Sequence, residues 1–190
     1  MKKITLAASA LLLLSTAGFS QTWNWDKAHS QLNFGISHLG ISEIAGSFGG
    51  VTAKITATKD DLSDAVVELT ADVATISTGN EQRNTHLKSP DFFDAAKYPT
   101  LTFKSTSFKS AGGKDYTVTG DLTFHGVTKP VVLTATFNGT IVNPQSKKTV
   151  GGWKVKGIVK RTDFGIATGF PATMLGDDVQ LNANAEFVKD

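Results

Sequence analysis

The sequence has no cysteine among its 190 residues. A disulfide framework, a thiol nucleophile and a lipid-modified cysteine after the leader are therefore excluded. The sequence also has no G-x-S-x-G elbow, no P-loop and no G-x-G-x-x-G fingerprint, so it lacks these common nucleophile and nucleotide sites. These absences predict a protein that has no catalytic residues.

Metal-ligand spacing and an excess of charge are also missing. The four histidines, His29, His38, His86 and His125, stand singly, without an H-x-H or H-E-x-x-H spacing, so we expect neither a metal site nor a cofactor. There are 19 Lys and Arg residues against 17 Asp and Glu residues. Nucleic-acid binding needs basic residues in excess and in clusters, and we expect none here.

Long apolar runs are absent except at the N-terminus. Met1-Lys2-Lys3 precedes an apolar segment over Ile4–Ala17, and small residues follow up to Ser20. This pattern is typical of a secretory signal peptide and is too short to span a bilayer comfortably, although a retained anchor is the alternative. We predict a signal peptide over residues 1–20 and one exported domain over 21–190, periplasmic or secreted, with no membrane span after cleavage.

What the remaining sequence does contain is repeated alternation of apolar and polar residues, which is typical of β-strands with one buried face. No crossover helices separate these segments, so an all-β fold follows, with the antiparallel sheet closed into a barrel or folded into a sandwich. The pair Gly49-Gly50 predicts a bend. The eight expected strands run approximately over 31–37, 51–58, 67–73, 101–108, 116–124, 131–141, 153–160 and 179–187.

Two segments interrupt the alternation. Residues Glu81–Lys88 favour a short helix with Asn80 as the N-cap, and a turn through Ala95-Ala96 is expected after Ser89-Pro90-Asp91. Residues Thr162–Asp177 contain three glycines and a proline and favour a long loop, with or without a helical turn. Both segments are long enough to close one end of a barrel or to contact a ligand.

Small residues are frequent on the apolar faces of the expected strands. Eight strands enclose a barrel that side chains just fill, or that holds one small ligand if those side chains are small. The pattern therefore favours a ligand cavity, although taper or tight bends of the barrel would need the same residues. The small residues concerned are Ala71, Gly120, Ala135, Gly139, Gly157, Ala183 and Ala185.

Two polar residues continue apolar faces. His38 follows the face of Leu32, Phe34 and Ile36, and Arg161 follows that of Val159. A buried guanidinium needs an acid, backbone carbonyls or an anionic ligand group. One hypothesis is that His38 or Arg161 meets the polar head of a ligand, and the alternative is a structural pair such as Arg161 with Asp163.

A set of short motifs, in order along nearly the whole expected domain, resembles the YceI-like, polyisoprenoid-binding family. Asn84 departs from this resemblance, because the family often has an acid after the arginine. The motifs are Trp25-Asp26, His29-Ser30, Gly46-Ser47-Phe48, Ile76-Ser77-Thr78-Gly79, His86-Leu87-Lys88-Ser89, Gly120–Lys129 and Arg161-Thr162-Asp163-Phe164-Gly165.

The resemblance implies an eight-stranded antiparallel lipocalin-like barrel in the periplasm, with an isoprenoid lipid or a quinone as its apolar ligand. Dimers are common in the family, so a homodimer is a further expectation. We therefore expect a binding or carrier protein; the alternatives are an enzyme that uses the same cavity, or a stress-response or structural protein with a packed core. The residues expected to line the cavity are Phe34, Ile36, His38, Phe48, Phe92, Phe93, Phe103, Phe124, Phe137, Arg161, Phe164 and Phe187.

Overall fold

The computed structural model describes residues 20–190, so nearly all of the expected signal peptide lies outside the described residues. The described chain forms one antiparallel sheet, a short helix α1 (Glu81–Lys88) and two 3-10 turns, η1 (Val73–Thr75) and η2 (Arg161–Phe164). The strands are β1 (Gln21–Trp25), β2 (Gln31–His38), β3 (Ser42–Phe48), β4 (Thr52–Ala57), β5 (Val66–Asp72), β6 (Thr100–Gly112), β7 (Asp115–Phe124), β8 (Val127–Val142), β9 (Thr149–Lys160) and β10 (Leu175–Lys189).

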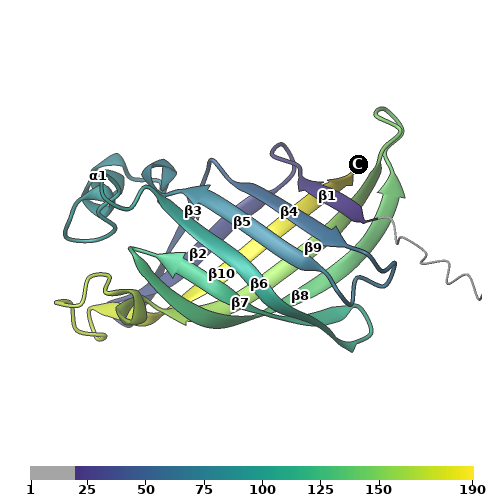
Figure 1. Ribbon diagram of the computed structural model, residues 1–190. Coiled ribbons are helices and arrows are strands. Elements are labelled where there is room, and N and C mark those ends of the chain that lie inside the picture. Colours follow the sequence, from purple (N-terminus) through teal and green to yellow (C-terminus); the bar gives the residue numbers. More distant parts are fainter. Residues whose placement is uncertain (1–19) are drawn as a thin grey trace, which may run out of the picture.

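The sheet closes into a barrel with eight strand positions (Figure 1). The order is β1-β4-β5-β6-β7-β8-β9-β10, and β1 pairs with β10 to close the ring. Strand β2 pairs with β10 over Leu175–Asn184, and β1 pairs with the same strand over Phe187–Lys189. Because β1 and β2 share one edge of β10, they occupy one position in the barrel. The expected antiparallel eight-stranded barrel is confirmed.

The sequence pattern did not reveal β1 and β3 as separate strands. Each is the first part of a long strand that bends: β1 continues into β2 after a turn at Asp26–Ser30, and β3 continues into β4 after Gly49-Gly50. The glycine bend is as predicted, because Gly50 has a φ of +57° and a Cβ there would lie 2.9 Å from the Cβ of Asp72. Strand β3 was missed because its apolar residues do not alternate clearly.

The helix and the long loop follow the sequence pattern. Asn80 caps α1 by accepting a hydrogen bond from the Arg83 amide at 2.9 Å, which satisfies one of the free donors of the first turn. Residues 90–97 form turns, and η2 with further turns occupies 161–174. Strand β10 begins at Leu175, earlier than predicted, because a register shift between Leu175 and Val179 keeps it paired with β2.

The small residues on the apolar faces divide into two groups. Gly120 and Gly157 leave no free space, because the Phe103 ring lies 2.5 Å from where a Cβ of Gly120 would be and Leu133 covers Gly157 in the same way. Gly139 has open space beside it but a φ of +117° at a bulge. These glycines therefore serve close packing and bends, as the alternative interpretation states. The alanines Ala135, Ala183 and Ala185 do face a cavity.

Candidate ligand cavity

A cavity of about 450 Å³ runs inside the barrel, and its lining is almost entirely apolar. The volume lies within the range of about 300–1,000 Å³ that is common for small-molecule sites. The longest strands have 12 to 16 residues, which at about 3.3 Å per residue and a tilt of about 40° gives a barrel about 30–40 Å tall. The interior is therefore shaped to enclose a long apolar molecule.

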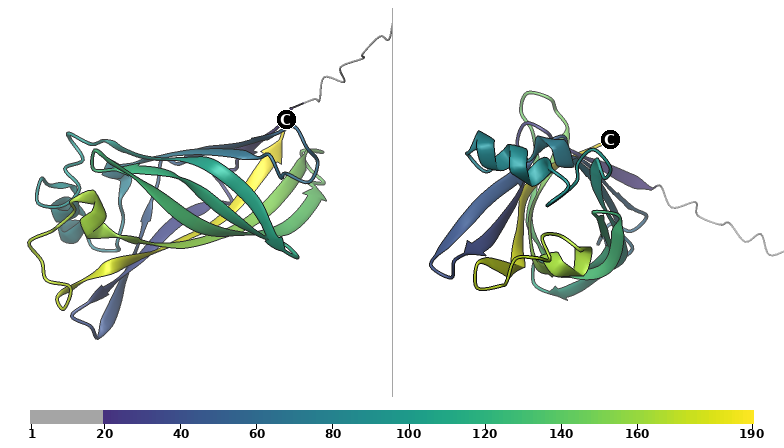
Figure 2. Two further views of the ribbon diagram at one scale, coloured as in Figure 1. Left: turned by 60° about the horizontal axis from the view of Figure 1, so that its bottom comes forward. Right: turned by 90° about the vertical axis from the view of Figure 1, so that its left-hand side faces the viewer.

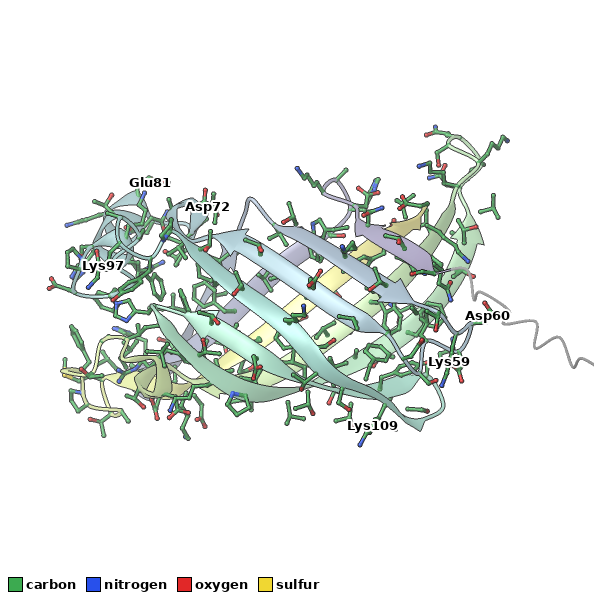
Figure 3. The ribbon with its side chains drawn as sticks, in the orientation of Figure 1. Lys59, Asp60, Asp72, Glu81, Lys97 and Lys109 are labelled. Atoms are coloured by element: carbon green, nitrogen blue, oxygen red, sulfur yellow. The ribbon has the colours of Figure 1, made fainter. Side chains whose placement is uncertain are left out.

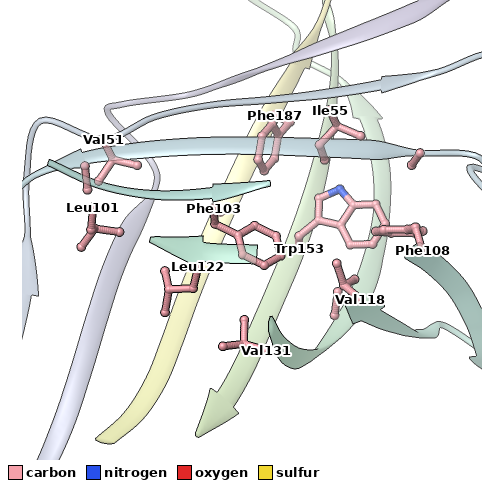
Figure 4. Packing of buried hydrophobic residues seen from close by; sticks show 14 of the residues in the cluster. Val51, Ile55, Leu101, Phe103, Phe108, Val118, Leu122, Val131, Trp153 and Phe187 are labelled. Atoms are coloured by element: carbon pink, nitrogen blue, oxygen red, sulfur yellow. The ribbon is translucent and has the colours of Figure 1, made fainter. Parts of the chain in front are cut away.

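An aromatic cluster around Trp153 lies at one end of the cavity, and Figure 4 shows Trp153 beside Phe108. The Trp153 ring lies 4.7 Å from the Phe137 ring, 5.7 Å from that of Tyr116 and 5.9 Å from that of Phe108, centroid to centroid. These residues come from four adjacent strands, β6 to β9. They form the closed end of the barrel, where β6 and β7 are joined by a short turn.

A second aromatic cluster surrounds the other end of the cavity. Phe48 lies at its centre, with ring centroids 5.5 Å from Phe34, 6.1 Å from Phe93 and 6.0 Å from Phe124. Phe164 from η2 lies 6.4 Å from Phe124. All five rings line the cavity, so this cluster forms a neck through which a ligand would pass.

Beyond the neck the cavity is lined by residues of α1, of the loop over residues 165–174 and of the β2–β3 hairpin tip. These three segments lie at the same end of the barrel (Figure 2). The inner face of the hairpin contributes Ile36, His38 and Ile44 to the lining. Only a single bridge, Ser47 with Ser77, joins β3 to the segment before α1. The hairpin therefore widens this end, which we call the mouth.

The segment around α1 is fixed by buried polar contacts. Asn84 is only 3% exposed, and its Oδ1 accepts hydrogen bonds from the amide and the hydroxyl of Thr78, both at 2.8 Å. Arg83 donates from Nε and Nη2 to the hydroxyl and the carbonyl of the same threonine. Asn84 thus satisfies two donors without a carboxylate. Thr78 and Arg83 also line the mouth.

Arg161 is buried at 4% exposure, and backbone carbonyls satisfy it. Nε donates to Gly176, Nη1 donates to Ile166 and Ala167, and Nη2 donates to Phe170 and Leu175, at 2.5–3.1 Å. A guanidinium has five N–H donors, so all five are accounted for. The sequence left open an acid, backbone carbonyls or an anionic ligand group as partners of Arg161, and the structure shows backbone carbonyls. The side chain therefore holds the loop at the mouth in shape.

Most residues expected at the site line the cavity. Arg161 reaches the lining although its donors face the loop. Phe137 lies outside the main cavity, in the closed-end cluster, where it borders a second cavity of about 10 Å³ with Trp23, Ile55, Leu62 and Trp153. The expected residues that do line the main cavity are Phe34, Ile36, His38, Phe48, Phe92, Phe93, Phe103, Phe124, Arg161, Phe164 and Phe187.

The sequence analysis missed several residues at the mouth. Leu39 follows His38 beyond the end of β2, and Phe170 and Met174 lie in the loop after η2. The sequence could have indicated them, because large apolar residues without charged neighbours are unusual in a loop that contacts only water. Arg83 and His86 belong to the motifs that carry the family resemblance but were not expected in the lining, because their helix showed no amphipathic pattern.

The histidines have different surroundings. His86 packs against the Phe92 ring, and its Nε2 lies 3.8 Å from Asp91 Oδ2 with both side chains exposed. His29 Nδ1 lies 2.9 Å from Asp26 Oδ2, and this hydrogen bond raises the pKa of His29 and lowers that of Asp26. Within residues 20–190, Asp26, His29 and Glu186 are the group whose ligand atoms approach closely enough to hold a metal.

No helix within residues 20–190 has the length and apolar character that a membrane crossing requires.

Comparison with known proteins places these features in a family. The family model described as a YceI-like domain matches residues 23–187. A UPF0312 protein of Pseudomonas savastanoi pv. phaseolicola is 40% identical over 188 residues, covering 93% of this chain and 94% of the relative. Protein YceI of Escherichia coli strain UMN026 is 37% identical over 172 residues, covering 88% and 89%.

Solved structures share the fold. The Campylobacter jejuni YceI protein is 32% identical with a TM-score of 0.73, and the match covers 100% of this chain and 99% of that one. Burkholderia cenocepacia BcnA is 25% identical with a TM-score of 0.77, covering 85% and 98%. A domain from Saccharophagus degradans, described as polyisoprenoid-binding, has a TM-score of 0.66 at 16% identity, covering 88% and 98%.

Proposed function

Since the chain belongs to the family of YceI-like domains, we propose that it binds and carries an isoprenoid lipid or a quinone-like apolar molecule inside its barrel. The observation that carries this proposal is the long apolar cavity, closed by Trp153 at one end and open at the other. The name of the Saccharophagus degradans domain agrees with this ligand class, but its low identity carries only the fold.

The physical argument favours an apolar chain over a polar ligand. Each methylene that leaves water for an apolar site contributes roughly 0.8 kcal/mol, and the cavity wall offers few hydrogen bonds to a polar molecule. Most polar side chains of the lining lie at the mouth, namely His38, Thr78, Arg83 and His86, whereas Asn33 and Asn182 lie at paired positions of β2 and β10. We therefore place the ligand's tail toward Trp153 and its head group at the mouth, near His38 rather than on the saturated guanidinium of Arg161.

The proposal is tested first by native mass spectrometry of the mature protein purified from the cells that make it, followed by organic extraction and identification of the lipid. We expect one isoprenoid-type molecule per chain. A protein that arrives empty and also refuses added isoprenoids and quinones would overturn the carrier function and favour a packed barrel.

A matched pair of variants links the ligand to the cavity. Ala183 lies in the middle of β10 and faces the cavity, so Ala183→Phe fills the space that an apolar chain would occupy. Ala45 lies on β3 with its side chain exposed, so Ala45→Phe adds the same ring outside. We expect the first variant to lose the bound lipid and the second to keep it; equal retention by both would place the ligand elsewhere.

Export is part of the proposal. The segment 1–20 has the composition of a signal peptide, and a carrier of membrane-derived lipids in the periplasm, or one that is secreted, needs such a leader. Mass analysis of the intact mature protein tests this: a mass that begins near Gln21 supports export, and a full-length chain in the cytoplasm contradicts it.

A further inference from the structure

The mouth of the cavity has an apolar rim built from two chain segments. The β2–β3 hairpin contributes Leu39 and Ile41, and the loop after η2 contributes Phe170 and Met174. All four are among the large apolar residues that the described chain leaves exposed, and Ile41 is the most exposed at 85%. We use the term apolar rim for these four residues.

The two segments of the apolar rim are held together. The Leu39 amide donates a hydrogen bond to the Met174 carbonyl at 2.9 Å, and the Phe170 carbonyl accepts from Arg161. The Phe170 ring lies 5.5 Å from that of Phe92. The exposed side chains are thus presented by a fixed framework, which distinguishes them from scattered surface residues that need no explanation.

Charge is absent from both segments. Residues 39–42 read Leu-Gly-Ile-Ser, and residues 165–175 contain no Asp, Glu, Lys or Arg. The charged residues of this end lie outside these two segments: Asp163 and Asp177 flank the loop, Glu43 follows the hairpin tip, and Glu81 and Lys97 lie beside α1 and in the turns after it (Figure 3). The two segments are therefore apolar and uncharged, and charged residues begin where each segment ends, an arrangement that suits the boundary between acyl chains and head groups.

The apolar rim is continuous with the cavity. Leu39, Phe170 and Met174 are exposed and also line the cavity, so a path of apolar surface leads from solvent to the interior. We propose that the apolar rim inserts into the surface of a lipid bilayer, so that an apolar ligand enters or leaves without crossing water. This inference rests on the proposed carrier function, and it adds the partner from which the ligand comes.

A second copy of the chain is the competing occupant. A stable dimer needs about 800 Å² of matched surface from each partner, and four side chains on two loop tips offer a small area of uneven shape. Insertion into a fluid bilayer requires no matched surface and depends on the buried apolar area. The geometry of the apolar rim therefore favours the bilayer.

The test uses flotation of the mature protein with phosphatidylcholine vesicles that contain no isoprenoid. Ile41 belongs to the apolar rim but not to the cavity lining, so Ile41→Glu changes docking without changing the ligand site. We expect Ile41→Glu to lower vesicle binding roughly tenfold, because a charged side chain is costly at the apolar boundary, and Ile41→Trp to raise it. Ile158→Glu, on the outer wall at 62% exposure, is the control and should bind vesicles normally.

Two further measurements separate the outcomes. The rate of transfer of a quinone from loaded vesicles should fall in Ile41→Glu, while equilibrium binding of the detergent-dispersed quinone stays unchanged. If wild type and Ile41→Glu float equally, the docking proposal is overturned even where the quinone binds. If light scattering shows a wild-type dimer that Ile41→Glu dissociates, the apolar rim is a contact between copies and the bilayer proposal is wrong. If the wild-type protein does not bind the quinone at all, the carrier function is overturned instead.

Discussion

The two ends of the barrel differ in how they are built: one is packed with aromatic rings, and the other is formed by loops. The closed end packs three aromatic rings from adjacent strands around Trp153. Charged residues lie in its turns and near its strand ends, among them Lys59, Asp60 and Lys109 (Figure 3). The mouth is built from loops, contains a buried arginine held by carbonyls, and exposes apolar side chains.

The difference shows how one β-barrel separates stability from access. Aromatic side chains bury large apolar areas and are expected to dominate the stability of the end that they fill. Backbone hydrogen bonds to one side chain can fix a loop locally without coupling it to the sheet. We therefore expect changes at the closed end to affect the whole barrel, and changes at the mouth to affect mainly the loop and the ligand.

The largest effect is expected from Trp153→Ala. Removing a buried tryptophan side chain costs about 3–5 kcal/mol, and here it leaves Phe108, Tyr116 and Phe137 without their common neighbour. Urea unfolding should show a lower midpoint with an unchanged slope, and hydrogen exchange should accelerate in all strands. Acceleration confined to β8 and β9 would contradict the view that this end stabilises the barrel as a unit.

Arg161→Met should have a smaller and more local effect. The change removes the guanidinium that donates to five loop carbonyls. We expect the free energy needed to open the loop to fall by roughly 2–4 kcal/mol. Part of this loss is offset because the variant no longer buries a charge. Hydrogen exchange should accelerate over residues 165–175 and not near Trp153. Arg161→Lys, with three donors, should lie between the two. If Arg161→Met lowers ligand affinity without faster exchange of the loop, Arg161 contacts the ligand's head group, as the first hypothesis from the sequence states.

Arg161 also illustrates what the sequence could reveal. Alternation along residues 153–161 predicted that its side chain points inward, because a strand has a period of two. It could not identify the partners, because five carbonyls of a loop without regular structure leave no signature in side-chain pattern. The same limit applies to β3: pairing over Ser42–Phe48 depends on the neighbour β2, and its own sequence alternates too weakly to be recognised.

A moderate effect is expected from Asp177→Asn at the mouth. The turn η2 lacks a side-chain cap of its own, and Asp177 supplies one by accepting hydrogen bonds from the Thr162 amide and hydroxyl. Substitution should lower the stability of the loop by about 0.5–1 kcal/mol, discounted for partial exposure. Hydrogen exchange over residues 161–177 measures this loss. Faster exchange at the closed end as well would contradict the view that the two ends of the barrel are stabilised independently.

The same carboxylate makes the mouth sensitive to acid. Burial raises the pKa of Asp177, but the hydrogen bonds from Thr162 and the charge of Lys160 outweigh it, so the pKa lies below its ordinary value of 3.8. A lowered folded pKa means that the stabilisation is present above the unfolded pKa and is lost as the pH falls through the folded pKa. Loop exchange in wild type should therefore increase below about pH 4, and Asp177→Asn should remove this dependence.

The smallest effect is expected at the turn between β1 and β2, away from the mouth. The hydrogen bond from His29 to Asp26 raises the pKa of the histidine above 6.5, so its contribution to stability is complete below the unfolded pKa and is lost as the pH rises through the folded value. In Asp26→Asn we expect the His29 pKa, followed by NMR, to move back toward 6.5 with little change in the unfolding midpoint, because the pair is exposed. A large loss of stability, or a change in exchange of the loop over 165–174, would show that this turn is coupled to the mouth.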